Sequence, residues 1–531
     1  MKNLITIFII TICLSGFSQN NTPIAVNDTF FLTVNDSLKL YQLSGVVNPG
    51  YLLENDYDPD GDILYIDSAF YNGTGAFNSS LNIPVPNLHQ LYINYTPPLN
   101  FWGIDSVKYI LHDNGNPILY DTATIYIYVK RPEYETLDLN NINASFGLNL
   151  LFSSPFPSTL NIPLIQAGFE APKGYGANTI YGANLWISGK NQNNAYVTAS
   201  VFGDVGIPII KTDFISRSGP IMDSMYYEQY SYQWDRLWKI TSAEINYHIN
   251  NWNTSGYQPI EVIENWPAHG DVSKGQAANL APFIDNNNDG VYNPLDGDYP
   301  KIKGQQAVYF IYNDHNNYAE TGGDVMGCEM HYMAYAYNCP SDSAINNTIF
   351  LDYTIYNRSN LTYDSTYVGM FTDFDLGNSS DDFVGCDVNR STYYAYNGDS
   401  IDENANGVLG YGAYPPAQGV VFLKGAKQDD DGIDNAIGIN ALETINGKGF
   451  GDGIPDNEYW GMEIFNYFVI GSGVQGFPQG GAWFHNFLSG KWGDSSTMVF
   501  GDNGHISGAG TNIAAKYMFP GNSDPLNYGT G

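Results

Sequence analysis

The strongest constraint on the fold is a set of segments in which apolar and polar residues alternate. The clearest lie at residues 91–95, 123–129, 307–312 and 348–356. Because successive side chains of an extended chain point to opposite sides, a period of two predicts β-strands. The 42 tyrosines favour strands, and the 56 glycines, with abundant Asn, Ser and Thr, favour turns between them. The sequence therefore predicts an all-β protein.

One segment departs from this pattern. Apolar or aromatic side chains recur at positions 245, 248, 249 and 252, which is helical spacing. Thr241 and Glu244 stand where the two side chains of a capping box are found. We expect a short helix over residues 242–252 in a chain that otherwise consists of strands and turns.

The loop at residues 285–296 has the spacing of a calcium-binding loop. Gly290 occupies its sixth position, where the chain must turn sharply. Ca²⁺ takes about six to eight oxygen ligands, and alternating Asp and Asn side chains can direct oxygens at one centre. Such side chains fill positions 1, 3, 5, 9 and 12 of the loop, namely Asp285, Asn287, Asp289, Asn293 and Asp296.

This loop differs from an EF-hand in two respects. Its last position is Asp instead of Glu, and Pro294 stands at position ten. The flanking residues have no helical pattern, so we expect a calcium loop between strands. The alternative is a surface turn, rich in Asp and Asn, that holds no metal.

The charge composition agrees with cation binding. The chain has 55 acidic and 21 basic residues, a net charge of −34. Of the acidic residues 41 are Asp and 14 are Glu, and Asp favours turns and metal loops over helix faces. This negative charge argues against nucleic acid as a partner, because phosphates need Lys and Arg. It also argues against docking on an anionic membrane surface.

The N-terminus has the features of a secretory signal peptide at residues 1–18. Lys2 precedes an apolar stretch at 4–14, and Gly16 and Ser18 provide the small residues of a cleavage site. The apolar stretch is shorter than a membrane span, and no other stretch is apolar enough to be one. We expect cleavage near Ser18 and a secreted or cell-surface protein without a transmembrane segment.

Three cysteines remain after that cleavage, Cys328, Cys339 and Cys386. Cys328 and Cys339 can form a disulfide outside the cytoplasm, but protein cores also hold free cysteine. The odd number leaves both interpretations open. If disulfides do not stabilise the chain, bound calcium is a substitute.

Residues 22–131 are predicted to form a separate domain, with short strands at regular spacing and a break at 130–132. Within it Asp56, Asp58, Asp60 and Asp62 place four carboxylates in seven residues. These groups repel one another unless a cation neutralises them. The alternative to a calcium site is a solvated Asp-Pro-Asp-Gly turn.

Five stretches of this domain follow one another in a recognisable order, at residues 25–29, 53–64, 95–97, 101–106 and 121–125. They are similar to the Ig-like, cadherin-like repeat of bacterial surface and secreted proteins. The resemblance implies an antiparallel β-sandwich, often calcium-binding, that serves in adhesion or as a spacer and performs no chemistry. Members usually occur in tandem, and we find one copy here.

Residues 140–531 are predicted to be a large β-rich region of one or two subdomains, without a repeat of fixed period. Acidic turns recur at 402–407, 429–434 and 452–456, and each has roughly half the spacing of a calcium loop. Taken singly each is a turn; together they predict one further calcium site.

Parts of this region, at residues 418–424, 450–460 and 518–528, resemble large secreted proteins of the kind exported by the type IX secretion system. The resemblance implies a secretion route and no activity. Such cargo carries a C-terminal sorting domain, and none is visible here. Because the chain stops at residues 527–531 without a closing strand, we expect a truncated sequence.

The sequence also permits a secreted enzyme, although it lacks HExxH, GxSxG and Walker motifs. The alternative function is glycoside hydrolysis, which needs two carboxylates in an aromatic cleft. Asp373 and Asp375 share one face of a predicted strand, which is compatible with a metal site or with the acid/base pair of such an enzyme. Trp460, Trp483 and Trp492 are candidate sugar platforms, but aromatic residues more often pack cores.

The sequence thus favours a secreted or cell-surface, calcium-binding structural or adhesion protein. Its predicted partner is a matrix component, an extracellular glycan or a surface protein. A polysaccharide-active enzyme is the alternative.

Overall fold

The computed structural model divides the chain into two compact units, residues 1–131 and 132–531. The predicted signal peptide and the chain end at 527–531 lie outside the described residues. The structure describes residues 20–33, 37–41, 52–71, 73, 76–82, 90–98, 101, 103–130, 134–147, 150–156, 164–200, 217–230, 233–315, 323–405, 407–435, 446–468, 473–476, 478 and 480–523.

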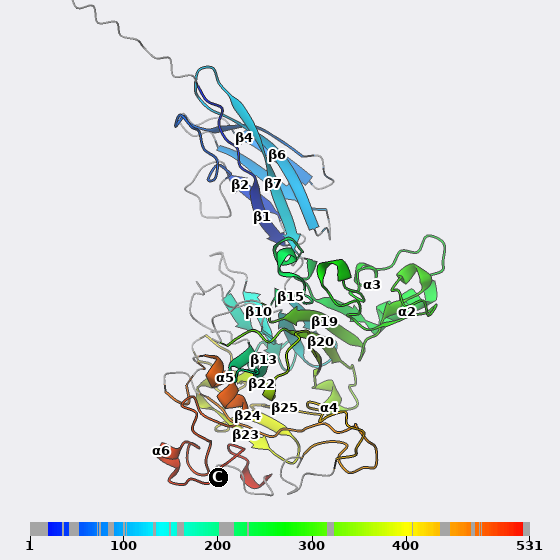
Figure 1. Ribbon diagram of the computed structural model, residues 1–531, viewed down its shortest axis with the longest axis vertical. Helices are drawn as coiled ribbons and strands as arrows, with labels where there is room; N and C mark the ends of the chain where they lie inside the picture. Colours follow the sequence, from blue (N-terminus) through cyan, green and yellow to red (C-terminus); the bar gives the residue numbers. More distant parts are fainter. Residues whose placement is uncertain are drawn as a thin grey trace, which may run out of the picture. The chain divides into compact units, whose positions relative to one another are not determined.

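The first unit is a sandwich of two sheets (Figure 1). One sheet has the strand order β1-β7-β6-β3 and the other the order β2-β5-β4. β1 pairs with β7 in parallel, and the other pairs are antiparallel. The strands are β1 Asp28–Thr33, β2 Leu38–Tyr41, β3 Tyr65–Phe70, β4 Ala76–Asn82, β5 Gln90–Thr96, β6 Gly103–His112 and β7 Tyr120–Lys130.

Alternation along the strands builds the core of this unit. Ile125 and Ile127 of β7 are fully buried, whereas Tyr126 between them is 38% exposed. Ile93 and Tyr95 of β5, in the opposite sheet, belong to the same buried cluster. The strands predicted at 91–95 and 123–129 are therefore confirmed, and their apolar faces lie between the sheets.

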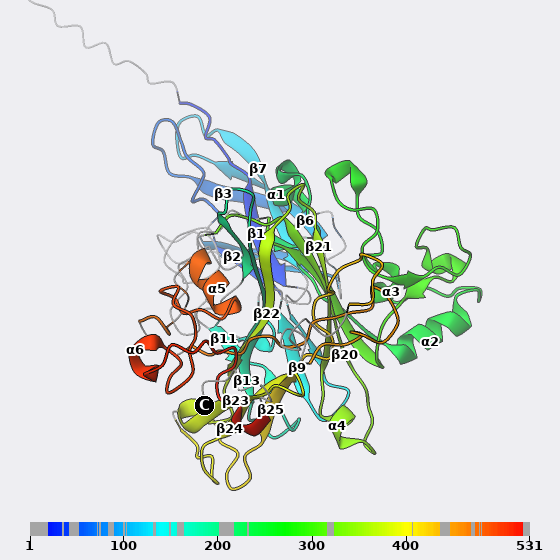
Figure 2. The ribbon, with the colours of Figure 1, turned by 60° about the horizontal axis from the view of Figure 1, so that its bottom comes forward.

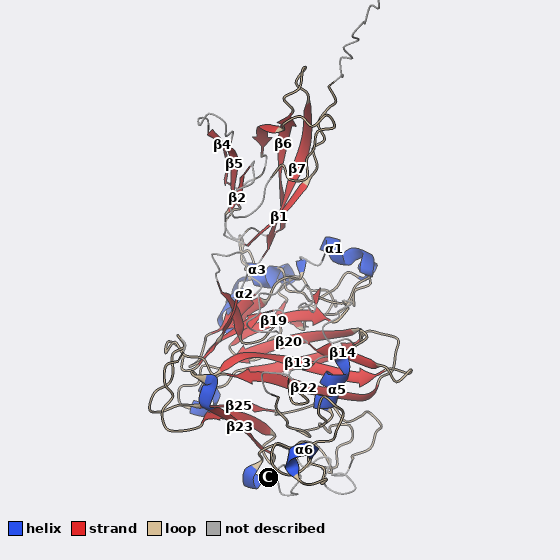
Figure 3. Ribbon diagram, turned by 90° about the vertical axis from the view of Figure 1, so that its left-hand side faces the viewer, coloured by secondary structure: helices blue, strands red, loops and turns tan. Residues whose placement is uncertain are grey.

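The second unit also consists mainly of strands (Figure 3). One sheet has the order β15-β19-β20-β21, with β16 also paired to β19, and another has the order β14-β13-β22. Smaller sheets are β12-β9-β8, β23-β24-β25, β10-β11 and β17-β18. The all-β prediction is confirmed.

The strands of this unit include those predicted at 307–312 and 348–356. Their bounds are β8 Tyr134–Leu137, β9 Asn143–Gly147, β10 Ser153–Phe156, β11 Leu164–Ala167, β12 Phe169–Glu170, β13 Ile180–Lys190, β14 Tyr196–Ser200, β15 Arg217–Ser218, β16 Trp238–Thr241, β17 Phe283–Ile284, β18 Tyr299–Pro300, β19 Gln306–Asn313, β20 Cys328–Ala336, β21 Phe350–Asn357, β22 Asp364–Phe374, β23 Asp382–Asp387, β24 Thr392–Asn397 and β25 Ala417–Val421.

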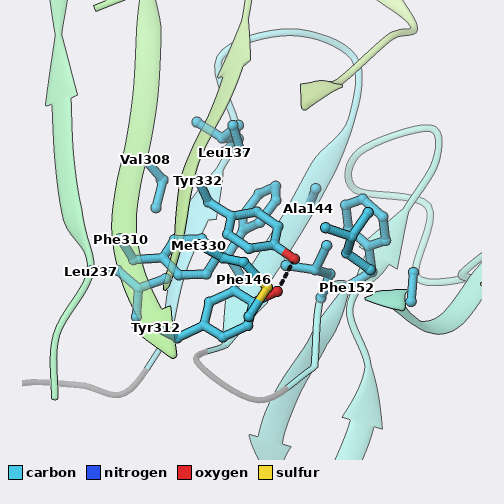
Figure 4. Packing of buried hydrophobic residues seen from close by; sticks show 14 of the residues in the cluster. Leu137, Ala144, Phe146, Phe152, Leu237, Val308, Phe310, Tyr312, Met330 and Tyr332 are labelled. Carbon is cyan, nitrogen blue, oxygen red and sulfur yellow. Dashed lines mark hydrogen bonds between the residues drawn. The ribbon is translucent and has the colours of Figure 1, made fainter. Parts of the chain in front are cut away.

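β19 is buried along its whole length because it has packed neighbours on both faces. Phe310 and Tyr312 join a cluster with residues of β13 and β20 (Figure 4). Tyr309, on the other face, joins a cluster formed mostly by residues 222–302. In the first cluster the hydroxyls of Tyr312 and Tyr332 are hydrogen-bonded to each other, which satisfies two polar groups in an apolar setting.

The helices are short: α1 Tyr227–Tyr230, α2 Ser242–Asn251, α3 Glu261–Glu264, α4 Ser343–Asn346, α5 Gly481–Leu488 and α6 Ile506–Ala509. α2 begins with the predicted capping box between Thr241 and Glu244, so the predicted helix is confirmed. Phe484 of α5 packs against Trp186 of β13, with ring centroids 4.7 Å apart. Figures 1 and 2 show α2 and α5 on opposite sides of the sheets.

None of the helices described has the length and apolar character required to cross a membrane. None of the three described cysteines forms a disulfide; Cys328 and Cys386 are buried, and Cys339 is partly exposed. A Cys328–Cys339 disulfide is thus absent from the structure.

Candidate metal centres and an acidic cleft

The loop at 285–296 connects two paired strands. β17 and β18 are antiparallel, with Phe283 opposite Pro300 and Ile284 opposite Tyr299. The expected setting of this loop, between strands and without flanking helices, is confirmed.

The first half of the loop folds its side-chain oxygens toward its own backbone. The Asp289 N–H donates to Asp285 Oδ1 at 3.3 Å and to Asn287 Oδ1 at 3.0 Å. The Gly290 N–H donates to Asp285 Oδ2 at 2.8 Å. Asn288 and Gly290 have φ of 59° and 80°, which Asn and Gly tolerate best. Asp285, Asn287 and Asp289 are therefore brought together.

The second half forms a separate small group. Asn293 Nδ2 donates to Asp296 Oδ2 at 2.6 Å, and Asn293 Oδ1 caps a 3₁₀ turn by accepting from the Leu295 N–H. The predicted positions 9 and 12 of the loop thus bind each other.

Asp298 holds the two halves of the loop and was missed by the sequence analysis. It is fully buried, and its two oxygens accept from the N–H groups of Asn286 and Asn293, each at 2.8 Å. It lies beyond the twelve-residue pattern, so no spacing rule identifies it.

The acidic turn of the first unit is divided in the structure. Asp58 Oδ1 accepts from the N–H groups of Asp60 and Asp62 at 2.7 Å and 3.2 Å, while Asp58 Oδ2 is buried and has no partner in the described ranges. Desolvation and the charges of Asp58, Asp113 and Asp60 raise the pKa of Asp62. Asp58, Asp60 and Asp62 therefore share one turn.

Asp56 has different neighbours. It accepts from the Val26 N–H at 2.7 Å and from the Tyr109 hydroxyl at 3.0 Å. Burial raises its pKa, as it does that of the adjacent Asp28, which reaches about 7. Asp56 is thus directed at the core of the sandwich.

Two of the acidic turns of the second unit meet. Asp429 and Asp431 of one turn and Asp456 of the other each place a carboxylate oxygen within 4.8 Å of the others. Among the described His, Cys, Asp and Glu side chains, this is the group of three that could hold a metal by that distance criterion. From the sequence, the three acidic turns together predict one further calcium site, and the structure brings carboxylates of two of those turns together.

Asp373 and Asp375 line a cleft of about 2730 Å³ between β21, β22 and the segments at 418–427 and 459–468. Burial raises the pKa of Asp373 to about 6. Burial and the charges of Asp373 and Asp382 raise the pKa of Asp375 to about 7. Both residues line the cleft, but β22 ends at Phe374, so Asp375 lies just beyond the strand on which the two were predicted to share a face.

The tryptophans proposed as sugar platforms are placed differently from one another. Trp460 lines the cleft. Trp492 is fully buried and donates its indole N–H to the Gly504 carbonyl at 2.9 Å, so its assignment as a platform is wrong. Trp483 packs against Phe487, with ring centroids 6.2 Å apart. The local sequence around a tryptophan does not distinguish a core position from a cleft wall.

Residues 20–128 match the sequence model of a family described as bacterial Ig domain. The match confirms the predicted Ig-like domain and indicates a surface or structural protein. No curated protein matches the chain.

A solved structure described as a nucleoside hydrolase-related hypothetical protein from Saccharophagus degradans, associated with carbohydrate metabolism, is 21% identical over 21% of this chain. The alignment covers 26% of that protein, and its TM-score is 0.14. With so low a TM-score the likeness carries no argument about fold or function.

Proposed function

We propose that this protein is a secreted or cell-surface structural or adhesion protein whose loops are fixed by bound Ca²⁺. The observation that carries the proposal is the clustering of Asp285, Asn287 and Asp289 around one turn of the β17–β18 loop. These are oxygen donors of the kind that Ca²⁺ prefers, at the first three ligand positions of a calcium loop. The bacterial Ig domain at 20–128 supports a surface location.

In this proposal calcium acts structurally. It neutralises carboxylates that otherwise repel one another and so fixes the loops that present a binding surface. The partner is an extracellular glycan, a matrix component or a surface protein, since the net charge of −34 is unsuited to nucleic acid. Export would follow cleavage near Ser18, and the type IX system is the proposed route.

Thermal unfolding in EDTA and across a calcium titration tests the proposal. Because calcium binds the folded state, stabilisation should rise by about 2.7 kcal/mol at a hundredfold excess over Kd. Extracellular modules often bind with Kd of about 0.1–1 mM. A saturable rise with Ca²⁺ that Mg²⁺ does not reproduce supports the proposal. Identical unfolding in EDTA and in millimolar Ca²⁺ contradicts it.

Glycoside hydrolysis is the second candidate function. It is favoured by the raised pKa of Asp373 and of Asp375, because a general acid must keep its proton near neutral pH. Release of reducing sugar from a panel of polysaccharides is the test. Turnover that is lost in both Asp373→Asn and Asp375→Asn supports this function, and absence of turnover across the panel argues against it.

A further inference from the structure

A buried carboxylate next to Asp429, Asp431 and Asp456 is only half satisfied by the fold. Glu458 is fully buried. Its Oε1 accepts from the Asn435 N–H at 2.7 Å, but its Oε2 is buried and has no hydrogen-bond partner among the residues that the structure describes. A buried carboxylate oxygen in this position calls for a cation or a proton, because burial of unpaired charge is costly.

Hydrogen bonds between the two turns hold Glu458 near the three aspartates. The Gly432 N–H of one turn donates to Asp456 Oδ1 of the other at 2.9 Å. The backbone brings the groups together, since the Gln428 N–H donates to the Glu458 carbonyl at 2.9 Å. Glu458 therefore lies beside the group of three aspartates, where the two turns meet.

Further buried oxygens of the same two turns also lack hydrogen-bond partners within the described part of the chain. Buried side-chain oxygens in folded proteins nearly always accept a hydrogen bond, so their accumulation here needs an explanation. One is a carboxylate oxygen and the others are amide oxygens, and hard oxygens of both kinds are calcium ligands. They are Asp429 Oδ1, Gln428 Oε1, Asn435 Oδ1 and Asn457 Oδ1.

We propose that Asp429, Asp431, Asp456 and Glu458 hold a Ca²⁺ ion that joins the turns at 428–435 and 452–458. The donors are all oxygens, and their number allows the six to eight ligands, roughly, that Ca²⁺ takes. Zn²⁺ favours nitrogen and sulfur donors, and Mg²⁺ tends to keep several of its waters. The site shares no residue with the loop at 285–296. The experiments on this site therefore test it separately from the loop on which the proposed function rests.

The ion would close a small backbone ladder. Lys427 and Lys448 both form bridges with Tyr459, which directly follows Glu458. Both lysines are exposed at the surface, so trypsin can cut there once the ladder opens. Calcium that binds only the closed ladder slows cleavage by a factor of about 1 + [Ca²⁺]/Kd.

The test is limited proteolysis of the full chain after calcium is removed with EDTA. Cleavage after Lys427 and Lys448, followed by mass spectrometry, should slow by roughly tenfold when Ca²⁺ is ten times its Kd. Mg²⁺ at the same concentration should give little protection. Cleavage that is indifferent to Ca²⁺, or equally slowed by Mg²⁺, overturns the assignment.

Variants separate this site from a merely structural acidic cluster. Glu458→Gln removes one charge with almost no change of shape, so it should abolish most of the calcium protection while leaving the EDTA form as resistant as wild type or more so. Asp430→Asn is the matched control, since Asp430 lies in the same turn but pairs with Lys427. Its ratio of cleavage rates without and with calcium should stay that of wild type.

Calorimetry of calcium binding provides the second measurement. Glu458→Gln and Asp456→Asn should each lose one bound ion relative to wild type, whereas Asp289→Ala should keep the protection of Lys427 and Lys448. If Glu458→Gln binds as many calcium ions as wild type and is equally protected by calcium from trypsin, the site proposed here is refuted. The loop at 285–296 is tested separately, by Asp289→Ala.

Discussion

Asp456 accepts a hydrogen bond from the backbone N–H of Gly432 at 2.9 Å, although the two residues are 24 positions apart. The bond fixes the turn that carries Asp431 against the turn that carries Asp456. Gly432 has φ of 81°, and no atom lies within 4 Å of where a Cβ would stand. Conformational strain, and not space, is therefore what favours glycine at this position.

Gly432→Ala should weaken calcium binding at the site proposed for the two turns. The left-handed backbone costs an Ala residue about 1–2 kcal/mol, and relief of that strain would displace the N–H that Asp456 accepts. Gly407→Ala is the control, because Gly407 has φ of 84° with equally open space. Both variants should lose similar stability in EDTA, and only Gly432→Ala should shift the calcium concentration that protects Lys448. The same shift in both would contradict this explanation.

Asp289→Ala should remove most of the calcium-dependent stabilisation that the loop at 285–296 confers on the second unit. Asp289 occupies a ligand position, and it also accepts from the Val291 N–H at 2.8 Å. Asn288→Gly is the matched control, because it keeps a residue that tolerates φ of 59° and removes no predicted ligand. Calcium titrations followed by thermal unfolding measure both. A calcium response of Asp289→Ala equal to that of the control would exclude the loop as a calcium site.

Local features of the fold could be predicted from the sequence because their causes are local. The alternation at 123–129 predicted β7, and the pair Thr241 and Glu244 predicted the start of α2. The setting of the loop at 285–296 followed from the absence of helical patterns beside it. In each case residues within a few positions of one another determine the structure.

The acidic groups of the second unit could be predicted only in part, because long-range pairing assembles them. Asp431 and Asp456 belong to turns that the sequence marks as acidic, but their meeting depends on the pairing of Lys427 with Tyr459. The burial of Glu458 depends on the same pairing. Long-range contacts also explain why Trp492 was wrongly predicted to be a sugar platform. It is buried against residues such as Gly504, and the sequence spacing does not indicate that contact.

Arg358→Met should destabilise the second unit strongly. Glu329 is fully buried and accepts from Arg358 Nη2 at 2.6 Å and from the Ile221 N–H at 2.8 Å. Burial alone would raise the pKa of Glu329, but hydrogen bonds from His331, Arg358 and Ile221 outweigh it and lower that pKa. Removal of the guanidinium leaves the buried carboxylate with His331 and the Ile221 N–H alone, at a cost of up to about 3–5 kcal/mol.

The control for this prediction is Arg390→Met. Arg390 pairs with Asp387, but its side chain is 80% exposed, and exposed pairs contribute about 0–1 kcal/mol. Urea unfolding of the two variants gives the comparison. Equal losses of stability in both variants would mean that the buried Glu329–Arg358 pair contributes no more to the free energy of unfolding than an exposed ion pair.

Asp375→Asn should become progressively more stable than wild type as the pH rises. The carboxyl of Asp375 has a pKa of about 7 in the folded chain, against 3.8 as its ordinary value. Between these values the folded state holds a proton that the unfolded state has lost, so the free energy of unfolding of wild type falls as the pH rises from about 4 to 7. Above that window both states are ionised and the loss is complete.

Asparagine cannot ionise, and the variant therefore escapes this loss. Its advantage in free energy of unfolding should be small at pH 4 and reach on the order of 1–3 kcal/mol at pH 8, once solvent access to the cleft is allowed for.

Asp364→Asn, an exposed position at the start of the same strand, is the control and should show no such trend. Urea unfolding at pH 4, 6 and 8 in EDTA measures the three proteins. A constant difference between Asp375→Asn and wild type across this range would show that the buried carboxyl of Asp375 does not titrate near neutral pH, which would also remove the physical basis for Asp375 as a general acid.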